Sequence, residues 1–318
     1  MPPCRIAVIG LGEIGLNRHL PVIAAHPGFE IVASAKRHPV ATAIGGVQYR
    51  DYREMLASEP AIEAVAICTP PDVRGRIALD VIAAGKHVLL EKPPFSTLGA
   101  FRQVRLAAER AGVTLLGGWH SQFNLAVERA RDFLADQQVA SLEMVWNEDV
   151  AVYHPDQEWI WQAGGFGVFD AGVNGISILT RILPDPLVVR AATLRIPDGA
   201  QTPIAVEIDF AGLREEDRLH AGMDWRTPTA ERTIAIVTRS GHHLRMPNSG
   251  RRLEIDGTVL VDEANLEYPH IYDRFAELIA GGKSQLDEWP LVVVADAYLI
   301  GRTLPADAQG VPGVRTGG

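Results

Sequence analysis

The chain has 318 residues, of which 47% are hydrophobic and 22% charged, as is ordinary for a globular protein of about two domains. Its formal net charge is −9, with acids and bases dispersed, which disfavours a nucleic-acid or anionic membrane partner. Cys4 and Cys68 lie far apart without metal-ligand spacing, so we expect neither disulfides nor a metal site. Since no secretion signal or long apolar span is found, we expect a cytoplasmic protein that does not enter membranes.

Short apolar runs alternate with amphipathic segments over the first third of the chain. We predict strands at 5–10, 29–35, 62–68, 86–91 and 113–118, and helices at about 15–26, 51–58, 73–84 and 97–111. Apolar strands that alternate with helices are typical of a parallel sheet covered on both faces. The sequence therefore predicts a doubly wound α/β domain of Rossmann type over residues 1–120.

After a helix predicted at about 122–135, the pattern changes to strands separated by turns. These strands are predicted at 141–150, 187–196, 204–210, 233–239 and 242–247. Such a series indicates an antiparallel sheet with one solvated face. Its other face is expected to be covered by helices starting near Asp170 and at 267–281 and 290–303. Residues 121–318 are therefore predicted to form an α+β domain, with a frayed tail from 305 onward.

The first predicted strand ends in a glycine-rich turn with G-x-G-x-x-G spacing. Gly10, Gly12 and Gly15 supply the glycines, and Glu13 and Ile14 lie between the last two. Between a strand and a helix, such glycines permit a tight turn and close approach to a pyrophosphate, which the helix N-terminus attracts. The context predicts a dinucleotide site over the alternative, a glycine-rich turn without a ligand.

The segment at the end of the second predicted strand bears on cofactor choice. NAD-preferring sites carry an acidic residue about 20 residues after the glycine motif. Here Lys36 and Arg37 occupy that region, and two cations suit the 2′-phosphate of NADP. We therefore expect that NADP is accepted and that NAD is the alternative; a solvated basic turn is the interpretation without a ligand.

Polar stretches follow three strands of the first domain. They are 68–72, 91–95 and 119–121. Ligands of open parallel sheets bind outside the carboxyl ends of the strands, so we expect one crevice here, with Thr69, Pro70 and Glu91 on the cofactor side. Lys92 lies between a buried strand and two prolines, which makes it a functional candidate, with a simple ion pair as an equal alternative. His120 is interpreted as a pocket residue, with a structural histidine as the alternative.

Several motifs together resemble those of one enzyme family. Gly10-x-Gly12-x-x-Gly15, Glu91-Lys92-Pro93, Gly164-Gly165 and Asp170-x-Gly172 occur in this order. In these motifs, and over nearly its whole length, the chain resembles the Gfo/Idh/MocA oxidoreductases, and within them the bacterial L-arabinose/D-galactose 1-dehydrogenases. The resemblance implies a Rossmann domain, a second domain with a large open sheet often used for homo-oligomerisation, and NAD(P)-dependent oxidation of an aldose at C1 to the lactone.

The resemblance also implies roles for individual residues. Lys92 would lie near the nicotinamide and the reacting hydroxyl, with a Lys92–Pro93 peptide that is often cis, and Glu148, His154, Asp170 and Asn174 would line the sugar pocket. Asp170 is the first candidate for the proton acceptor, with Lys92 polarising the same oxygen or relaying the proton.

Asn174 departs from the wider family, in which many members have histidine at this position. An amide can hold a hydroxyl but cannot shuttle a proton. Trp159 or Trp161 would offer an apolar face to the sugar, although each is also a candidate core residue. Asp170 also suits a helix N-cap.

Other functions within the same fold stay open at this point. A non-catalytic dinucleotide-binding sensor is disfavoured because Lys92 and Asp170 are both present. A polyol or inositol dehydrogenase is disfavoured by Asn174, and an aldose–aldose oxidoreductase by the lack of an export segment.

Overall fold

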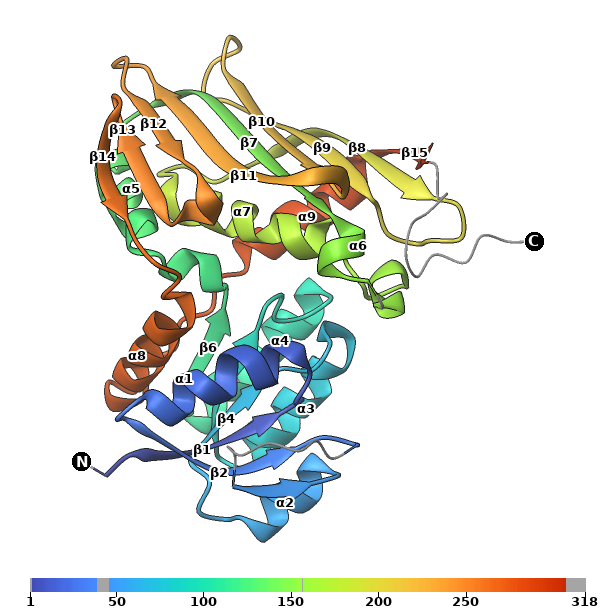
Figure 1. Ribbon diagram of the computed structural model, residues 1–318, viewed down its shortest axis with the longest axis vertical. Helices are drawn as coiled ribbons and strands as arrows, with labels where there is room; N and C mark the ends of the chain where they lie inside the picture. Colours follow the sequence, from blue (N-terminus) through green and yellow to red (C-terminus); the bar gives the residue numbers. More distant parts are fainter. Residues whose placement is uncertain (1, 39–45, 156, 307–318) are drawn as a thin grey trace. The chain divides into compact units, whose positions relative to one another are not determined.

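A computed structural model describes residues 2–38, 46–155 and 157–306 of the chain (Figure 1). The chain forms two compact units. The first comprises Met1–His120 and Leu266–Glu288, and the second comprises Ser121–Asn265 and Trp289–Gly318. The chain therefore returns to the first unit with Leu266–Glu288, a segment that the sequence analysis assigned to the second domain.

The first unit contains a six-stranded parallel sheet in the order β3-β2-β1-β4-β5-β6. Its strands are β1 (Cys4–Ile9), β2 (Phe29–Ala35), β3 (Val47–Tyr49), β4 (Ala64–Ile67), β5 (His87–Glu91) and β6 (Leu115–Gly118). All of β4 and the last four residues of β1 are buried, as in strands covered on both faces. The predicted Rossmann-type fold is confirmed. Only β3 has no predicted counterpart, because this short edge strand contains no buried residue.

Helices of the first unit follow the predicted alternation. They are η1 (Gly15–His19), α1 (Leu20–Ala25), α2 (Tyr52–Ser58), α3 (Pro71–Ala83), α4 (Leu98–Ala111) and α8 (Glu267–Ala280). Asp51 and Thr97 cap α2 and α4 by accepting hydrogen bonds from backbone N–H groups of the first turn. The helix α8 forms where predicted, but the expectation that it covers the second sheet is wrong. It packs on the first unit, where Phe275 stacks on Phe29 with 5.8 Å between ring centroids.

The second unit contains a nine-stranded sheet in the order β14-β13-β12-β11-β7-β10-β9-β8-β15. Its strands are β7 (Val139–Asp149), β8 (Val189–Pro197), β9 (Ala205–Phe210), β10 (Arg218–Asp224), β11 (Arg226–Thr238), β12 (His243–Met246), β13 (Arg252–Ile255), β14 (Thr258–Asp262) and β15 (Arg302–Ala306). Neighbouring strands are antiparallel except for β7 with β10 and β8 with β15. The large, mostly antiparallel sheet implied by the resemblance is confirmed.

Four strands of this sheet were missed by the sequence prediction. They are β10, β13, β14 and β15. The polar and glycine-containing sequence of β10, RLHAGMD, hides the alternation of a strand. The prediction of a helix to 303 followed by a frayed tail is wrong for β15, which pairs with β8 at the sheet edge, where Pro305 is tolerated. Residues 307–318 of that tail lie outside the described residues.

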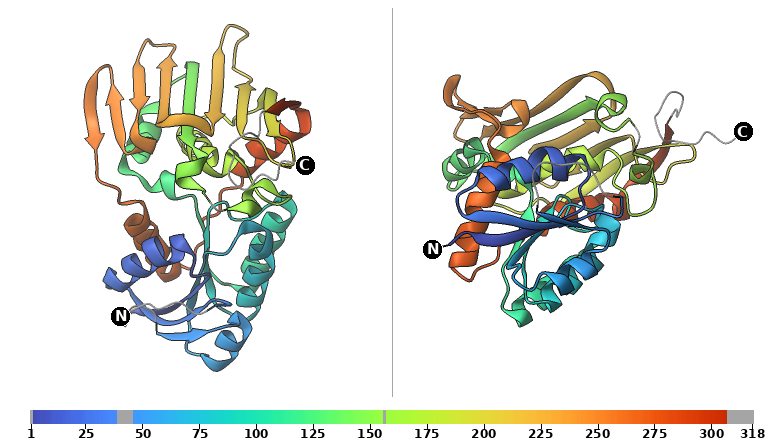
Figure 2. Two further views of the ribbon diagram at one scale, coloured as in Figure 1. Left: turned by 45° about the vertical axis from the view of Figure 1, so that its right-hand side comes forward. Right: turned by 60° about the horizontal axis from the view of Figure 1, so that its bottom comes forward.

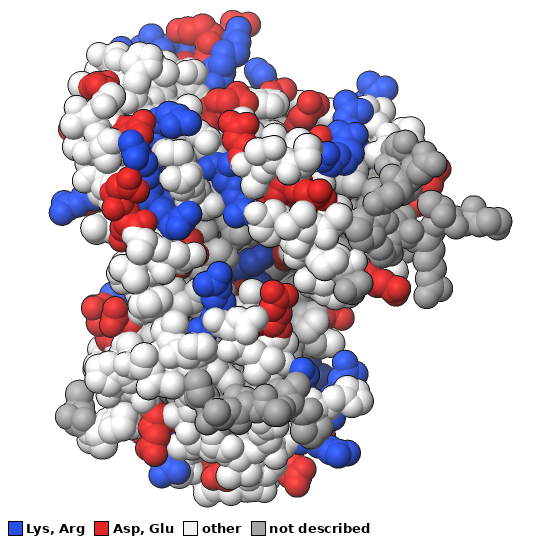
Figure 3. All heavy atoms as spheres, viewed as in Figure 1, with Lys and Arg blue, Asp and Glu red and all other residues white. Residues whose placement is uncertain are grey.

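Helices of the second unit cover one face of its sheet. They are η2 (His120–Phe123, its first residue in the first unit), α5 (Leu125–Leu134), α6 (Val150–Tyr153), η3 (Glu158–Trp161), α7 (Phe169–Ile182), η4 (Asn248–Gly250) and α9 (Trp289–Ile300). Among the described residues, Figures 1 and 2 show α5, α7 and α9 on one face of this sheet and no helix on the other. Basic and acidic side chains are interspersed over the face drawn in Figure 3, in keeping with the dispersed charges of the sequence.

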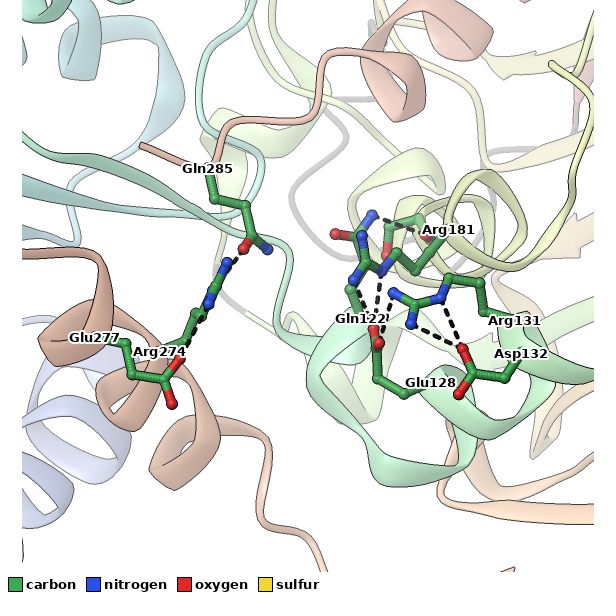
Figure 4. Close-up of polar contacts among 9 residues, drawn as sticks. Gln122, Glu128, Arg131, Asp132, Arg181, Arg274, Glu277 and Gln285 are labelled. Atoms are coloured by element: carbon green, nitrogen blue, oxygen red, sulfur yellow. Dashed lines mark hydrogen bonds and ion pairs between the residues drawn. The ribbon is translucent and has the colours of Figure 1, made fainter. Parts of the chain in front are cut away.

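Two glycines and a salt bridge fix the position of α7. A Cβ on Gly172 would lie 2.1 Å from the sulfur of Met223, and one on Gly175 would lie 2.6 Å from the sulfur of Met144, so a larger residue at either position would require the sheet side chains to shift. Arg181 of α7 donates hydrogen bonds of 2.9 and 2.8 Å to Glu128 of α5 (Figure 4). The helix that carries Asp170 and Asn174 is therefore firmly held within its own unit.

Candidate functional site

The glycine turn after β1 has the geometry of a dinucleotide-binding loop. Gly10 has φ of 95°, and a Cβ there would lie 2.8 Å from the backbone nitrogen of Thr69. A Cβ on Gly15 would lie 2.6 Å from the carbonyl oxygen of Gly10, whereas one on Gly12 would have no described atom within 4 Å. Gly10 and Gly15 are therefore needed by the turn itself, and Gly12 faces open space in which a pyrophosphate can approach the backbone.

A helix begins directly after this turn. Residues 13–25 are helical, with Glu13 exposed, Ile14 42% exposed and a π-helical turn over Gly15–His19. The unsatisfied N–H groups at a helix start attract a phosphate, and π-helical turns are frequent at functional sites. The loop and this helix therefore fit the pyrophosphate of NAD or NADP.

Lys36 and Arg37 lie beside the same turn. The N–H of Gly10 donates a 2.9 Å hydrogen bond to the carbonyl of Ala35, the last residue of β2, so the residues that follow Ala35 are adjacent to the glycine turn. Lys36 is half-buried and its backbone N–H bonds to the carbonyl of Tyr49, whereas Arg37 is exposed. Both cations thus follow the strand end where a Rossmann site binds the adenosine ribose.

The loop after β5 carries Lys92. Its peptide bond to Pro93 is cis, as the resemblance implied, and the lysine is half-buried. The backbone N–H of Lys92 donates a 2.5 Å hydrogen bond to the carboxylate of Glu91. Arg74, which the sequence analysis did not identify, donates to the backbone carbonyls of Thr69, Glu91 and Pro93. Arg74 therefore links the loop that follows β4 to the loop that follows β5.

Glu91 itself belongs to a buried network. One carboxylate oxygen accepts a hydrogen bond from Tyr268 and lies 3.4 Å from Nε2 of His19, whose Nδ1 lies 2.6 Å from the hydroxyl of Tyr272. Burial opposes the charged form of Glu91, but the hydrogen bond and charge of His19, with the charge of His120 and the Tyr268 hydroxyl, lower its pKa to about 2. Glu91 is therefore an ionised anchor that faces the interior of the unit.

The structure places His120 next to this network. Its Nδ1 lies 2.9 Å from a carboxylate oxygen of Glu267, and its ring stacks on Tyr268 with 5.7 Å between centroids. The side chain is 15% exposed. His120 is thus oriented by an acid and an aromatic ring, both from Leu266–Glu288, the segment that follows β14 in sequence.

In the second unit, Glu148 is also a buried and paired carboxylate. One oxygen accepts a 3.1 Å hydrogen bond from the indole of Trp225 and lies 3.7 Å from Nε2 of His154; the other accepts from Arg232. Burial raises the pKa of Glu148, but the nearby His154 and Arg232 side chains outweigh it, so the net shift is downward. No local pattern in the sequence identifies Arg232, which lies 84 residues from its partner.

Asp170 and Asn174 lie on the start of α7. This helix begins at Phe169 with Val168 as its N-cap, so Asp170 lies in the first turn and is not the cap. Asp170 is 6% exposed. The side-chain oxygen of Asn174 is buried and has no hydrogen-bond partner in the described part of the chain, as is also true of Nδ1 of His154. Buried polar atoms are normally hydrogen-bonded to protein or to ordered water, so these two atoms have hydrogen-bonding capacity that a water or a polar ligand can use.

The two tryptophans of the sequence prediction have different environments. Trp161 is 1% exposed and packs edge-on against Trp225, with 5.6 Å between ring centroids, so it is a core residue. Trp159 is half-buried in η3. Of the two, Trp159 retains a surface for a ligand.

The described residues contain neither a membrane-spanning helix nor a metal-binding cluster. No helix there is long and apolar enough to cross a membrane. The same residues contain no group of three or more His, Cys, Asp or Glu side chains able to hold a metal ion.

Comparison with known proteins assigns the family. The model of the oxidoreductase family with an NAD-binding Rossmann fold, Gfo/Idh/MocA, matches residues 4–118. A galactose 1-dehydrogenase of Pseudomonas fluorescens is 36% identical over 308 residues, which cover 97% of this chain and 99% of that protein. The chain belongs to the Gfo/Idh/MocA oxidoreductase family.

Solved structures have the same fold. A D-galactose-1-dehydrogenase from Rhizobium etli has a TM-score of 0.90 and 41% identity, covering 96% of this chain and 98% of that one. A 3-ketoreductase from Actinomadura kijaniata, in complex with TDP-benzene and NADP, has a TM-score of 0.82 at 20% identity, covering 96% and 99%, which is a likeness of fold alone. The chain is therefore an NAD(P)-dependent oxidoreductase similar to galactose 1-dehydrogenases.

Proposed function

We propose that the chain is an aldose 1-dehydrogenase that oxidises sugars of the D-galactose and L-arabinose type at C1 to the aldonolactone, with NAD or NADP. The observation that carries this proposal is the likeness over nearly the full length to two galactose 1-dehydrogenases, at 36% and 41% identity. L-Arabinose is included because its pyranose ring has the hydroxyl configuration of D-galactose and lacks only the hydroxymethyl group.

The chemistry requires a hydride acceptor, a proton acceptor and a means to orient C1. When bound, the nicotinamide supplies the hydride acceptor. Asp170 is assigned as the acceptor of the anomeric hydroxyl proton, and Lys92 as the cation that polarises the same oxygen or relays its proton. In support of this assignment, the main chain that carries each side chain is fixed, around Lys92 by the Arg74 and Glu91 contacts and at Asp170 by the first turn of α7.

Recognition of the other hydroxyls is assigned to the second unit. Asn174 would hold a hydroxyl through its amide, and His154 and Glu148 would bind the remaining ones. The buried and unpartnered oxygen of Asn174 and nitrogen of His154 support this assignment, because sugar hydroxyls can both donate and accept hydrogen bonds. The half-buried Trp159 would cover an apolar face of the sugar, and His120 of the first unit is also assigned to substrate binding.

Cofactor selection is assigned to the end of β2. Lys36 and Arg37 would pair with the 2′-phosphate of NADP, and no acidic side chain occurs among residues 34–38 to repel it. Gly10, Gly12 and Gly15, with the start of the following helix, would hold the pyrophosphate. We therefore propose that the enzyme accepts NADP as well as NAD.

A direct assay tests the proposed function. The purified protein is incubated with NAD or NADP over a panel of aldoses and polyols, while reduced nicotinamide is followed by absorbance and products are identified by mass spectrometry. We expect turnover with D-galactose and L-arabinose and formation of lactone or aldonate. Turnover of inositol or another polyol without turnover of any aldose would refute the proposal.

A further inference from the structure

We propose that Arg74 is a positioning residue that fixes the direction of the Lys92 side chain and joins the Lys92 loop to the cofactor loop. The inference rests on the proposed function, in which Lys92 takes part in proton transfer. Arg74 lies 17 residues before Glu91 in sequence, and it acts through Lys92 rather than on the substrate.

The position of Arg74 is unusual for a cation. It lies near the start of α3 and is only 3% exposed. A positive charge at this end of a helix opposes the helix dipole, and burial removes its hydration, so both effects are unfavourable. Such a residue is retained where its hydrogen bonds offset these costs, and the bonds of Arg74 go to loops at the carboxyl ends of β4 and β5.

The guanidinium bridges three carbonyl groups. Its Nη1 donates to the carbonyls of Glu91 and Pro93, which flank Lys92 on both sides, and its Nη2 donates to the carbonyl of Thr69. A planar guanidinium has five N–H donors in a rigid fork and can serve three acceptors at once, whereas an ammonium is a compact charge without this geometry. Lysine at this position would therefore keep the charge and lose part of the bridge.

The remaining polar groups of the Lys92 loop are anchored as well. The N–H of Lys92 bonds to the Glu91 carboxylate, which in turn is held by Tyr268 and lies 3.4 Å from His19. The two carbonyls that flank Lys92 accept from Arg74, and Pro93 has no N–H to satisfy. With its main chain held in this way, the lysine stem starts from a fixed direction, which is what proton transfer to a defined oxygen requires.

The third carbonyl extends the effect to the cofactor side. The backbone nitrogen of Thr69 lies so close to Gly10 that only glycine fits there, so the Thr69 backbone and the glycine turn are packed together. Arg74 therefore fixes the position of the Lys92 loop relative to the loop around Thr69, which contacts the glycine turn. Loss of the bridge should disturb turnover first and dinucleotide affinity to a smaller extent.

A double-mutant cycle separates positioning from general stability. The proteins are wild type, Arg74→Lys, Lys92→Ala and the double variant, with Arg76→Lys as a matched control, since Arg76 lies on the same helix and is exposed. We expect Arg74→Lys to lower kcat by about 10- to 100-fold in the wild-type background, as misplacement of a catalytic group does, and to change the KM for aldose much less. In the Lys92→Ala background it should lower kcat less than about 3-fold, because the effect passes through Lys92.

Amide hydrogen exchange keeps the inference testable apart from the proposed function. Amide hydrogen exchange at Lys92 and around Thr69 should be faster in Arg74→Lys and Arg74→Gln than in wild type, with exchange in α4 and β6 unchanged. This result does not depend on which substrate the enzyme oxidises, so absence of aldose turnover by wild type would refute the function and leave the positioning role to be judged by exchange. Equal loss of kcat in both backgrounds, uniform acceleration of exchange, or failure of both Arg74 variants to fold would each overturn the positioning role.

Discussion

The main chain around Lys92 in the first unit and the side chains of Asn174 and His154 in the second unit differ in how far protein groups satisfy their hydrogen bonds. Around Lys92, the flanking carbonyls, the backbone N–H and the Glu91 carboxylate are all engaged by protein groups. Asn174 and His154, in contrast, each have a buried side-chain atom without a partner in the described residues. The first region is organised before any ligand binds, whereas the second retains hydrogen-bonding capacity that a polyhydroxyl ligand can use.

This difference has energetic consequences. A buried polar atom without a partner costs about 1–3 kcal/mol in the free protein, and a ligand that supplies the partner recovers this free energy on binding. Removal of a donor from the Glu91 network instead destabilises the folded protein itself. Substitutions in the two regions should therefore separate folding stability from substrate binding.

The largest loss of kcat is expected for the two residues assigned to proton transfer, one in each unit. Lys92→Ala and Asp170→Asn should each lower kcat by about 10²-fold or more, because general acid–base groups contribute on this scale. Steady-state kinetics with saturating aldose and cofactor measures the effect. Lys283→Ala and Asp185→Asn, both at exposed positions, are matched controls. A near-normal kcat for Asp170→Asn would reduce that residue to a structural part of α7.

Tyr268→Phe should affect stability rather than substrate binding. It removes a hydrogen bond to the buried, ionised Glu91, and bonds to charged groups contribute about 1.5–3 kcal/mol. We expect chemical denaturation to show a free energy of unfolding lower by about 2 kcal/mol, with the KM for aldose unchanged. An unchanged stability with a raised KM would contradict the contrast between the two regions.

Asn174→Leu should give the opposite pattern, because it removes a buried side-chain oxygen that has no partner among the described residues. The variant should lose about 10-fold in kcat/KM for aldose, since one hydrogen bond to substrate is lost. Its free energy of unfolding should be unchanged or higher by up to about 1 kcal/mol. Destabilisation by more than about 2 kcal/mol would mean that the Asn174 amide is a structural group.

Cofactor preference should depend on the first unit alone. Replacement of Lys36 and Arg37 together by alanine should raise the KM for NADP by about 10-fold and leave the KM for NAD nearly unchanged, because only NADP carries the 2′-phosphate. Kinetics with each cofactor measures the two constants. An equal rise in the two KM values would show that Lys36 and Arg37 do not bind the 2′-phosphate.

The pH dependence of stability tests the ionised state of Glu91. The pKa of its carboxyl falls from its ordinary value of 4.5 to about 2 in the folded protein, so its contribution is complete above about pH 4.5 and is lost as the pH falls towards 2. A single group of this kind contributes a slope of at most about 1.4 kcal/mol per pH unit. Denaturation curves over this window should give a smaller slope for Glu91→Gln than for wild type, and identical slopes would contradict the ion-paired network.

The sequence correctly predicted the elements that depend on the spacing of nearby residues. The buried strands of the first sheet and the glycine turn follow from apolar runs and from positions that only glycine can occupy. The amphipathic pattern of α8 predicted a helix but not its neighbour, since an apolar face does not specify the surface that covers it. Strands such as β10 and β15 were missed because glycine, charged residues and proline interrupt the alternation, which pairing in the sheet overrides.

The residues of the candidate site likewise fall into those that local sequence patterns predict and those that they do not. Lys92, Asp170 and Asn174 belong to recognisable motifs. The contact of Arg74 with the Glu91 carbonyl spans 17 residues and that of Arg232 with Glu148 spans 84, so neither leaves a local pattern. For Arg74 one sequence feature was available, because a cation close to the start of a predicted helix is unfavourable and calls for a partner. For Arg232 only the register of β11 with β7, which pairs it with Trp146, brings it to Glu148.

The central claim, oxidation at C1, is tested most directly with D-galactose that carries deuterium on C1. The account predicts that deuterium is transferred to the reduced nicotinamide and that the product is the unlabelled lactone or aldonate, both identified by mass spectrometry. Reduced nicotinamide without deuterium, together with a product that retains the label on C1, would show that the enzyme oxidises a different carbon and would contradict the account.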